Sequence, residues 1–545
     1  MKHVSLRVCV SVCALALLAG ACGSDSSDDT SSSAESSATQ DTANTTTESD
    51  KADAKRADDA TPRPTGALPT EVTEITGGQG KPFFGQAVAA DLEAAGYQET
   101  EFRVAGDATS YTITGGAGVD GRYEVSAEDD PTPYATRIVV RRPVDAAKAN
   151  GSVLVEWLNV SGGIDANPDF AYAADEILRR GYTWVGVSAQ SIGVEGGATA
   201  VGIPGVSEAL GDKGLKGLDS DRYSILSHPC DTYSYDIYTQ VARAIRDPKL
   251  AEQLLGDLEF DRVLAVGESQ SAFALTTYYD AVQPLEEQFD GFFIHSRGGS
   301  ALPLRSDDKD MNIAGAITGE GVKIRTDRSE PVMMLLSESD LTSVIGYYKA
   351  RQDDSTNVRV WEVAGTAHAD RFLLGVVADQ IDCSGTVNSG PHHYAVKAAL
   401  AALDNWVATG EEPAKAEPLE VTDAATGPII ARDELGIAKG GIRLPQVAAP
   451  TAVLSGEPAG QNSVICLLLG STKDLSAEQL RQLYPSVADY TAAYEKATDE
   501  AVAAGFLLAA DKDAVLAEQA PDIVSAALGG WEMPHWSTRP GGHFQ

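Results

Sequence analysis

The sequence predicts an α/β fold in which helices cover both faces of a mostly parallel, doubly wound sheet. From about residue 67 onwards, short β-rich runs alternate with helical stretches. This alternation is typical of strand–helix–strand units, and right-handed crossovers make the sheet doubly wound. The chain has 545 residues, too many for one compact hydrophobic core, so the length favours one domain with insertions or two domains plus a tail.

The expected strands of the sheet are short and rich in β-branched residues. Helices near Ala171–Arg180 and Tyr235–Ile245 separate some of them. In such sheets ligands bind beyond the carboxyl ends of the strands, so the residues that follow each strand are where chemistry is expected. The strands are expected at residues 136–142, 152–158, 182–188, 262–266, 291–294, 331–336 and 358–363.

Two long Gly-rich stretches, residues 191–234 and 297–330, leave this edge of the sheet. They are interpreted as lid-like insertions or a pocket wall, and surface insertions without a role are the alternative. Residues 411–545 form a C-terminal helical extension, either a subdomain or a flank of the main domain. It contains a helical stretch at about Ala477–Ala504 and ends in a tail with Trp531 and Trp536.

The N-terminus predicts export. Lys2, His3 and Arg7 precede a short apolar run at residues 8–18, so residues 1–21 are interpreted as a signal peptide. Cys22 then follows Ala19, Gly20 and Ala21. This site fits ordinary signal cleavage, and it also resembles a bacterial lipobox, although Ala19 stands where Leu is usual.

Residues 22–66 consist mainly of Ser, Thr, Asp and Ala, a composition that predicts a disordered tether before a domain at residues 67–545. Lipidation of Cys22 would place the protein on the outer face of the cell membrane as a lipoprotein, and a secreted protein is the alternative. We expect the lipid to be the chain's only contact with the membrane.

The net charge of −37 disfavours nucleic acid as a partner, because an acidic surface repels phosphates. The sequence has no GxxxxGK[ST] motif, no CxxC pair and no HExxH motif. We therefore predict neither a cofactor nor a metal site.

The six cysteines allow at most one disulfide in the domain. Cys9 and Cys13 leave with the signal peptide, and Cys22 is the lipidation candidate. Of the remaining three, Cys383 and Cys466 are the favoured pair, which leaves Cys230 free. A fully reduced state of all three remains open.

The segment Val263-Leu-Ala-Val-Gly267-Glu268-Ser269-Gln270-Ser271 carries the strongest chemical signal. A strand that runs through Gly-x-Ser-x-small into a helix is typical of the nucleophile elbow of α/β-hydrolases. Ser269 is therefore the candidate nucleophile. Ser271 stands where this motif usually has a second glycine.

A serine hydroxyl needs a base and an acid that orients the base. His368 directly follows the last expected strand and is the candidate base; among the eight histidines, His295 is the best reserve because it also follows a strand. Asp340 is the candidate acid, with Glu338 as the alternative, because both follow the preceding strand. The order Ser, Asp, His is that of α/β-hydrolases.

An oxyanion in this architecture is bound by two backbone N–H groups. The residue after the nucleophile, Gln270, supplies one by its position. The second is expected in the loop after the strand at residues 152–158, from Ser161 or alternatively from Val160.

Several motifs resemble those of a bacterial family called simply α/β-hydrolase domain proteins. They are Val187-Ser-Ala-Gln190, Leu226-Ser-His-Pro229, Tyr233-Ser-Tyr-Asp236, Trp361-Glu-Val-Ala-Gly-Thr-Ala-His-Ala-Asp370, Asn388-Ser-Gly-Pro391, Gly440-Gly-Ile-Arg-Leu-Pro445 and Ala503-Ala-Gly-Phe-Leu-Leu508. The resemblance spans about residues 68–520, which implies that the C-terminal region belongs to the same unit. It implies a serine hydrolase fold with Ser269 and His368 in the roles given above. Cys230 falls where the family often has glycine, which suits an unpaired thiol.

The sequence therefore predicts a carboxylic ester hydrolase that forms an acyl-enzyme on Ser269 with a small-molecule ester. Two alternatives remain open at this point. One is a peptidase or an acyltransferase that uses the same three residues. The other is a catalytically inactive binding lipoprotein on the cell surface.

Overall fold

The computed structural model describes residues 66–80, 83, 90–116, 118–202, 210–306, 310–311, 313–424, 427–460 and 463–529. All of them belong to one compact unit, Thr61–Gln545. The predicted signal peptide, the lipidation candidate Cys22 and all but the last residue of the predicted tether lie outside the described residues. So do Trp531 and Trp536.

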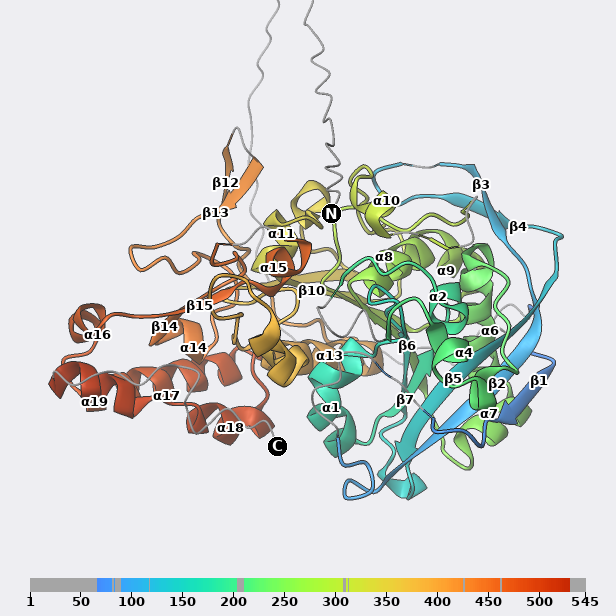
Figure 1. Cartoon of the computed structure of the whole chain (residues 1–545), viewed down its shortest axis with the longest axis horizontal. Coiled ribbons are helices and arrows are strands. Elements are labelled where there is room, and N and C mark those ends of the chain that lie inside the picture. Colours follow the sequence, from blue (N-terminus) through green and yellow to red (C-terminus); the bar gives the residue numbers. More distant parts are fainter. Residues whose placement is uncertain are drawn as a thin grey trace, which may run out of the picture. The chain divides into compact units, whose positions relative to one another are not determined.

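A nine-stranded sheet forms the centre of this unit (Figure 1). Six neighbouring strands are parallel to one another: β7, β6, β8, β9, β10 and β11. Three antiparallel strands, β1, β2 and β5, extend the sheet beyond β7. In sheet order the strands are β1 (Glu71–Glu74), β2 (Tyr97–Ala108), β5 (Thr132–Pro143), β7 (Thr183–Val187), β6 (Ser152–Trp157), β8 (Arg262–Glu268), β9 (Gly291–His295), β10 (Val332–Ser337) and β11 (Val358–Val363). The predicted α/β fold with a mostly parallel sheet is confirmed.

Alternating side chains of the central strands form two hydrophobic cores, one on each face of the sheet. On β6, Val153, Val155 and Trp157 pack on the face covered by α6 (Ser234–Arg246) and α8 (Gln270–Thr277). The intervening Leu154 packs on the opposite face, under α1 (Pro168–Arg180) and α13 (His392–Thr409). Because both faces are buried, these strands contain continuous apolar runs.

The expected helical stretch at about Ala477–Ala504 is divided in two. The structure has two helices, α16 (Ala477–Leu483) and α17 (Val487–Ala503). Pro485 lies between them, and proline has no N–H for a helical hydrogen bond. Ser486 then caps α17, because its side chain accepts a hydrogen bond from the N–H of Asp489.

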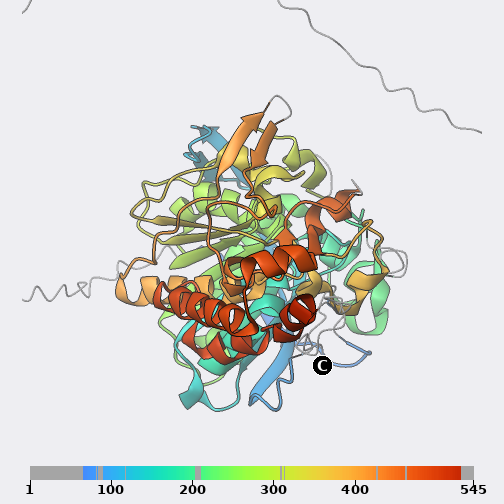
Figure 2. The ribbon, with the colours of Figure 1, turned by 90° about the vertical axis from the view of Figure 1, so that its left-hand side faces the viewer.

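The C-terminal region packs against the main sheet. Ile442 forms a parallel bridge with Val363 at the end of β11, and its side chain joins the core under α1 and α13. Figure 2 places the orange and red helices of this region nearest the viewer. Its elements are α14 (Pro445–Ala448), β14 (Ala452–Ser455), α15 (Val464–Leu469), β15 (Ser471–Asp474), α16, α17, η6 (Ala509–Asp511), α18 (Lys512–Ala517) and α19 (Pro521–Gly529).

Shorter elements connect the strands and carry the loops. They are β3 (Tyr111–Gly115), β4 (Glu124–Ala127), η1 (Ala146–Lys148), α2 (Ser191–Glu195), α4 (Gly214–Leu218), α5 (Ser220–Tyr223), η2 (Asp231–Tyr233), α7 (Pro248–Leu255), η3 (Tyr278–Val282), α9 (Gln283–Glu286), α10 (Ile313–Ile317), α11 (Glu338–Thr342), η4 (Tyr347–Ala350), α12 (Arg371–Leu374), η5 (Gly375–Gln380), β12 (Val421–Ala424) and β13 (Gly427–Ile430).

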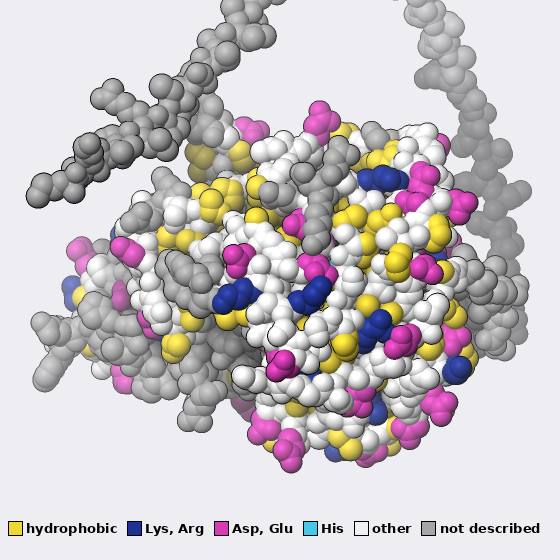
Figure 3. All heavy atoms as spheres, turned by 45° about the vertical axis from the view of Figure 1, so that its right-hand side comes forward, with side chains coloured by type: hydrophobic (Ala, Val, Ile, Leu, Met, Phe, Trp, Pro, Cys, Tyr) yellow, Lys and Arg dark blue, Asp and Glu magenta, His cyan; other side chains and the backbone are white. Residues whose placement is uncertain are grey.

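The surface reflects the acidic composition. On the face shown in Figure 3, Asp and Glu side chains are scattered among neutral ones, and Lys and Arg are fewer. Within the described ranges, no helix is both long and apolar enough to span a bilayer.

Candidate active site

Ser269 lies on the sharp turn between β8 and α8. Its backbone has φ 57° and ψ −120°, a strained conformation for a residue with a side chain. A Cβ atom at Gly267 would lie only 3.0 Å from the Cβ of Ser271. The glycine before the nucleophile therefore makes room for the serine that stands where the motif usually has a second glycine.

His368 and Asp340 lie beside Ser269 in a hydrogen-bonded chain. The Nε2 atom of His368 is 2.7 Å from Oγ of Ser269, and its Nδ1 atom is 2.7 Å from Oδ1 of Asp340. The three side chains come from the carboxyl ends of β8, β10 and β11, where the parallel sheet predicts a site. The structure thus brings together the three residues that the motif order selected.

The loops that carry the acid and the histidine are held by their own hydrogen bonds. Oδ2 of Asp340 accepts a hydrogen bond from the N–H of Ser337 at 2.6 Å, which leaves Oδ1 for the imidazole. Oγ of Ser339 accepts from the N–H of His368 at 2.7 Å. The relative position of acid and base is therefore fixed by the first turn of α11.

The electrostatics favour an ionised acid beside a basic imidazole. Burial alone would lower the pKa of His368, but the carboxyl groups of Glu268 and Asp340 raise it above its ordinary value. Burial alone would raise the pKa of Asp340, but the hydrogen bond and the charge of His368 lower it below its ordinary value. Asp340 is therefore a carboxylate at neutral pH.

The carboxylate of Glu338, the alternative acid, binds groups other than the imidazole of His368. Its carboxylate accepts hydrogen bonds from the N–H groups of Gly365 at 2.6 Å and Gly456 at 3.0 Å. Arg432 donates to the same carboxylate at 2.8 Å. Glu338 thus connects the end of β10 to the loop before His368 and to the C-terminal region, and it does not contact the imidazole.

The N–H groups of the expected oxyanion donors differ in their hydrogen bonds. Gln270 is the first residue of α8, so its N–H lacks an intrahelical acceptor and is free for a ligand. The N–H of Ser161 donates to Oδ1 of Asn159 at 2.8 Å and is therefore already engaged. The N–H of Val160 has no hydrogen-bond acceptor in the described part of the chain. Of the two candidates in this loop, Val160 therefore has the free N–H.

Two residues near the candidate site were missed by the sequence analysis. Glu268 lies inside the nucleophile motif, at a position where the motif sets no residue type, and its Oε1 is 3.4 Å from Nε2 of His368. Asn159 lies directly after the strand expected at residues 152–158, and it donates through Nδ2 to the carboxyl group of Glu268. The signal that could have identified both is their place directly at strand ends.

The reserve candidate His295 is unsuited to act as a base. It is fully buried, its Nδ1 is 2.8 Å from Asp169, and its Nε2 is 2.7 Å from Nε2 of His392. Burial lowers the pKa of His295 to about 3. Its backbone oxygen instead accepts the N–H of Ser269, so His295 supports the nucleophile turn.

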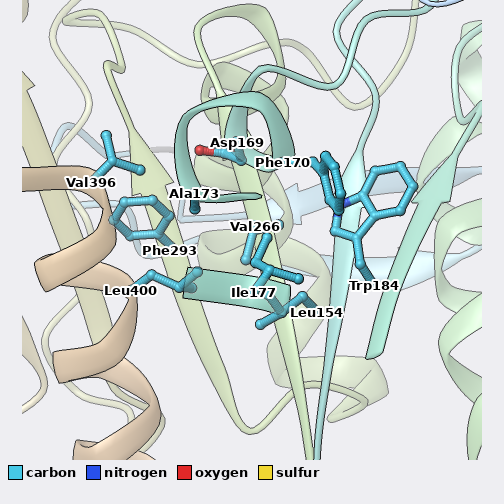
Figure 4. Close-up of a pocket in the computed structure, with 10 residues that line it drawn as sticks. All are labelled: Leu154, Asp169, Phe170, Ala173, Ile177, Trp184, Val266, Phe293, Val396 and Leu400. Atoms are coloured by element: carbon cyan, nitrogen blue, oxygen red, sulfur yellow. The ribbon is translucent and has the colours of Figure 1, made fainter. Parts of the chain in front are cut away.

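Two cavities lie near these elements. Figure 4 shows a small one between the sheet, α1 and α13, with a volume of about 10 Å³ and mainly apolar walls. It has room for about one water molecule. A second cavity, of about 550 Å³, is lined by residues 300–304, 306 and 319–322 together with Tyr123 and Thr277, among others. Part of the stretch 297–330 thus forms a pocket wall, although the three candidate residues do not line this cavity.

Cys383 and Cys466 form a disulfide, and Cys230 is a free thiol. The disulfide lies beside the segment that follows His368, where the N–H of Ala369 donates to the backbone oxygen of Leu468. Within the described ranges, no group of three or more His, Cys, Asp and Glu residues could hold a metal ion.

A family model described as "Alpha/beta hydrolase domain" matches residues 63–517. The chain belongs to the alpha/beta hydrolase domain family. The match includes the nucleophile turn, the histidine loop and most of the C-terminal region, so the family assigns all of them to one hydrolase unit. The resemblance expected from the sequence motifs is confirmed.

Several solved structures of hydrolases are distantly similar to this chain. A fungal esterase from Rhizomucor miehei is 12% identical, with 59% of this chain and 89% of that chain covered and a TM-score of 0.29. Esterase Est22 is 11% identical, with 60% and 86% covered and a TM-score of 0.32. A Xanthomonas campestris protein described as a serine hydrolase without a lid is 13% identical, with 51% and 89% covered and a TM-score of 0.25. Comparison with curated proteins finds no match.

Proposed function

We propose that this hydrolase cleaves carboxylic esters of small molecules through an acyl-enzyme on Ser269. The observation that carries the proposal is the chain of two 2.7 Å contacts from Ser269 through His368 to Asp340. Membership of the alpha/beta hydrolase domain family supports it. The strained backbone of Ser269 supports it as well, since strain of this kind concentrates at functional sites.

In the first half of the reaction, Oγ of Ser269 attacks the acyl carbon while Nε2 of His368 takes the hydroxyl proton. The charge of Asp340 stabilises the imidazolium, and the N–H groups of Gln270 and Val160 stabilise the oxyanion. The C–O bond to the alcohol then breaks, and Nε2 of His368 returns the proton to the leaving oxygen. An alcohol leaves, and an ester bond to Ser269 remains.

In the second half, water replaces the alcohol. Nε2 of His368 takes a proton from the water as its oxygen attacks the acyl carbon. The bond to Oγ of Ser269 breaks, the proton passes to Oγ, and the carboxylic acid leaves. The enzyme returns to its starting state without an external oxidant or reductant.

A fluorophosphonate probe tests the proposal, because it labels serines that are activated by a base. We expect the wild-type protein to be labelled and to hydrolyse p-nitrophenyl esters. Ser269→Ala and His368→Ala should lose both activities while they keep the wild-type circular dichroism spectrum. Full ester hydrolysis by Ser269→Ala would refute the proposal.

A further inference from the structure

Glu268 is a second carboxyl group at the imidazole of His368, and the mechanism above does not use it. It is the last residue of β8, and its side chain is only 5% exposed. Its Oε1 is 3.4 Å from Nε2 of His368, the nitrogen that also lies 2.7 Å from Oγ of Ser269. Asp340 and Glu268 therefore face opposite nitrogens of one ring.

The position of Glu268 is fixed by its neighbour across the sheet. Nδ2 of Asn159 donates to Oε2 of Glu268 at 3.3 Å and to the backbone oxygen of Glu268 at 3.1 Å. The amide oxygen of Asn159 is in turn held by the N–H and the hydroxyl of Ser161. No lysine or arginine among the described residues forms an ion pair with Glu268, so its charge is available to the imidazole.

Several titratable groups surround Glu268 and His368. They are Asp169 and Tyr172 of α1, His295 of β9, Asp340 of α11, Asp370 before α12 and His392 of α13. Burial lowers the pKa of both His295 and His392, so both rings are neutral at pH 7. They add no charge beside Glu268 in the pH range of the reaction.

Glu268 changes its charge close to neutral pH. Burial raises its pKa to about 8; the charges of Asp169 and Asp340 also raise it, whereas the charge of His368 and the hydrogen bond from Asn159 lower it. Both a neutral and an ionised Glu268 are therefore accessible while His368 works.

We propose that Glu268 is a positioning residue that, once ionised, stabilises the imidazolium of His368 from the Nε2 side. This inference rests on the proposed function. In the resting enzyme the neutral ring presents a lone pair at Nε2, which gains nothing from an ionised carboxylate. When the proton of Ser269 has moved to Nε2, the same carboxylate faces a positive N–H group. The interaction is thus stronger in the transition state than in the ground state, and such an interaction accelerates the reaction.

The consequence is a rate that rises twice with pH. The first rise follows deprotonation of His368, and the second follows ionisation of Glu268. Because the two groups interact, the two apparent pKa values belong to the pair. The measurement is the second-order rate of labelling by a fluorophosphonate between about pH 5 and about pH 10, a range that covers both ionisations.

In Glu268→Gln the second rise should disappear. The single remaining rise should stay near the first rise of wild type, because Glu268 is still neutral when His368 loses its proton in that step. At high pH the variant should react about tenfold more slowly than wild type, the effect of about one pKa unit of lost imidazolium stabilisation. Glu268→Asp keeps a carboxylate and should regain a second rise, whereas a purely structural role would not restore it.

Asp370→Asn is the matched control. Asp370 is also buried, and burial raises its pKa to about 7. Its Oδ1 accepts from Tyr172 and from the N–H of Leu373, while its Oδ2 has no hydrogen-bond partner within the described ranges. Asparagine keeps the bonded oxygen, so this variant should fold and should show both rises.

Three results would overturn the role of Glu268: two rises in Glu268→Gln, a single rise in wild type, or loss of the second rise in Asp370→Asn. A single rise in wild type would overturn the role of Glu268 even if Glu268→Gln does not fold. Labelling of Ser269→Ala at the wild-type rate is a different outcome, because it would refute the proposed nucleophile itself.

Discussion

At the scale of single residues, two acids two positions apart differ in their contacts. Asp340 touches Nδ1 of His368, whereas Glu338 touches two backbone N–H groups and Arg432. We expect Asp340→Asn to lower kcat for a p-nitrophenyl ester about 10³- to 10⁴-fold, because the imidazole loses its charged partner and its tautomer. The unfolding midpoint in urea should stay near that of wild type.

A retained kcat in Asp340→Asn, together with a comparable loss in Glu338→Gln, would contradict this assignment. It would show that Glu338 moves to the imidazole in the working enzyme. Both variants can be compared in one experiment, because their labelling by a fluorophosphonate and their hydrolysis of the ester are read from the same samples.

The pairing of Glu338 leads to a stability prediction. Its side chain is fully buried, and Arg432 is the cation that pairs with it in the described residues. Arg432→Ala would leave a buried, unpaired carboxylate, so we expect it to lower the free energy of unfolding by about 3 to 5 kcal/mol. Urea unfolding measures this change. Arg371→Ala, which removes a partner of the exposed Asp379, should cost less than about 1 kcal/mol.

The sequence could predict Ser269, Asp340 and His368 because each follows a strand of a parallel sheet. It favoured Asp340 but left Glu338 as an alternative, because both follow β10. The choice depends on the first turn of α11, where Asp340 takes the third position of a capping box with Ser337. The sequence also could not show that the side chain of Asn159 accepts the N–H of Ser161, the first candidate in its loop for an oxyanion donor.

At the scale of elements, the disulfide between Cys383 and Cys466 joins the segment after His368 to α15. It closes a loop with a sequence separation of 83. Loop-closure entropy gives such a crosslink about 4 to 5 kcal/mol of stabilisation. We expect Cys383→Ser with Cys466→Ser to lower the Tm and the labelling rate, as measured by calorimetry and fluorophosphonate labelling. Cys230→Ser should change neither, and an unchanged Tm in the double variant would contradict the prediction.

The elements that the sequence did not predict depend on contacts between distant residues. Strand β2 contains Glu101 and Arg103 among its inner residues and lacks a continuous apolar run. Glu101 is nevertheless fully buried, because Arg137 and Arg222 pair with it. A pattern of apolar residues cannot reveal a buried charge whose partners lie elsewhere in the chain.

At the scale of the whole molecule, the C-terminal region completes both the core and the candidate site. Leu444, Tyr490 and Val524 pack in the core under α1 and α13, and Arg432 reaches Glu338. We therefore expect a chain that ends at residue 410 to be insoluble or not labelled by a fluorophosphonate. The full chain, expressed separately under the same conditions, is the comparison. A soluble, labelled fragment would show that the region is dispensable.

The contacts that Arg432 and Gly456 make with Glu338 also affect when the candidate site can form during synthesis of the chain. Gly456, which donates to this carboxylate, is made long after Ser269, Asp340 and His368. While the chain grows from its N-terminus, the nucleophile turn can therefore fold before Glu338 has the contacts that hold the loops of Asp340 and His368. A ribosome-bound chain that ends before Arg432 should contain Ser269, Asp340 and His368 but lack their final alignment. Hydrolysis should therefore begin only when synthesis is nearly finished.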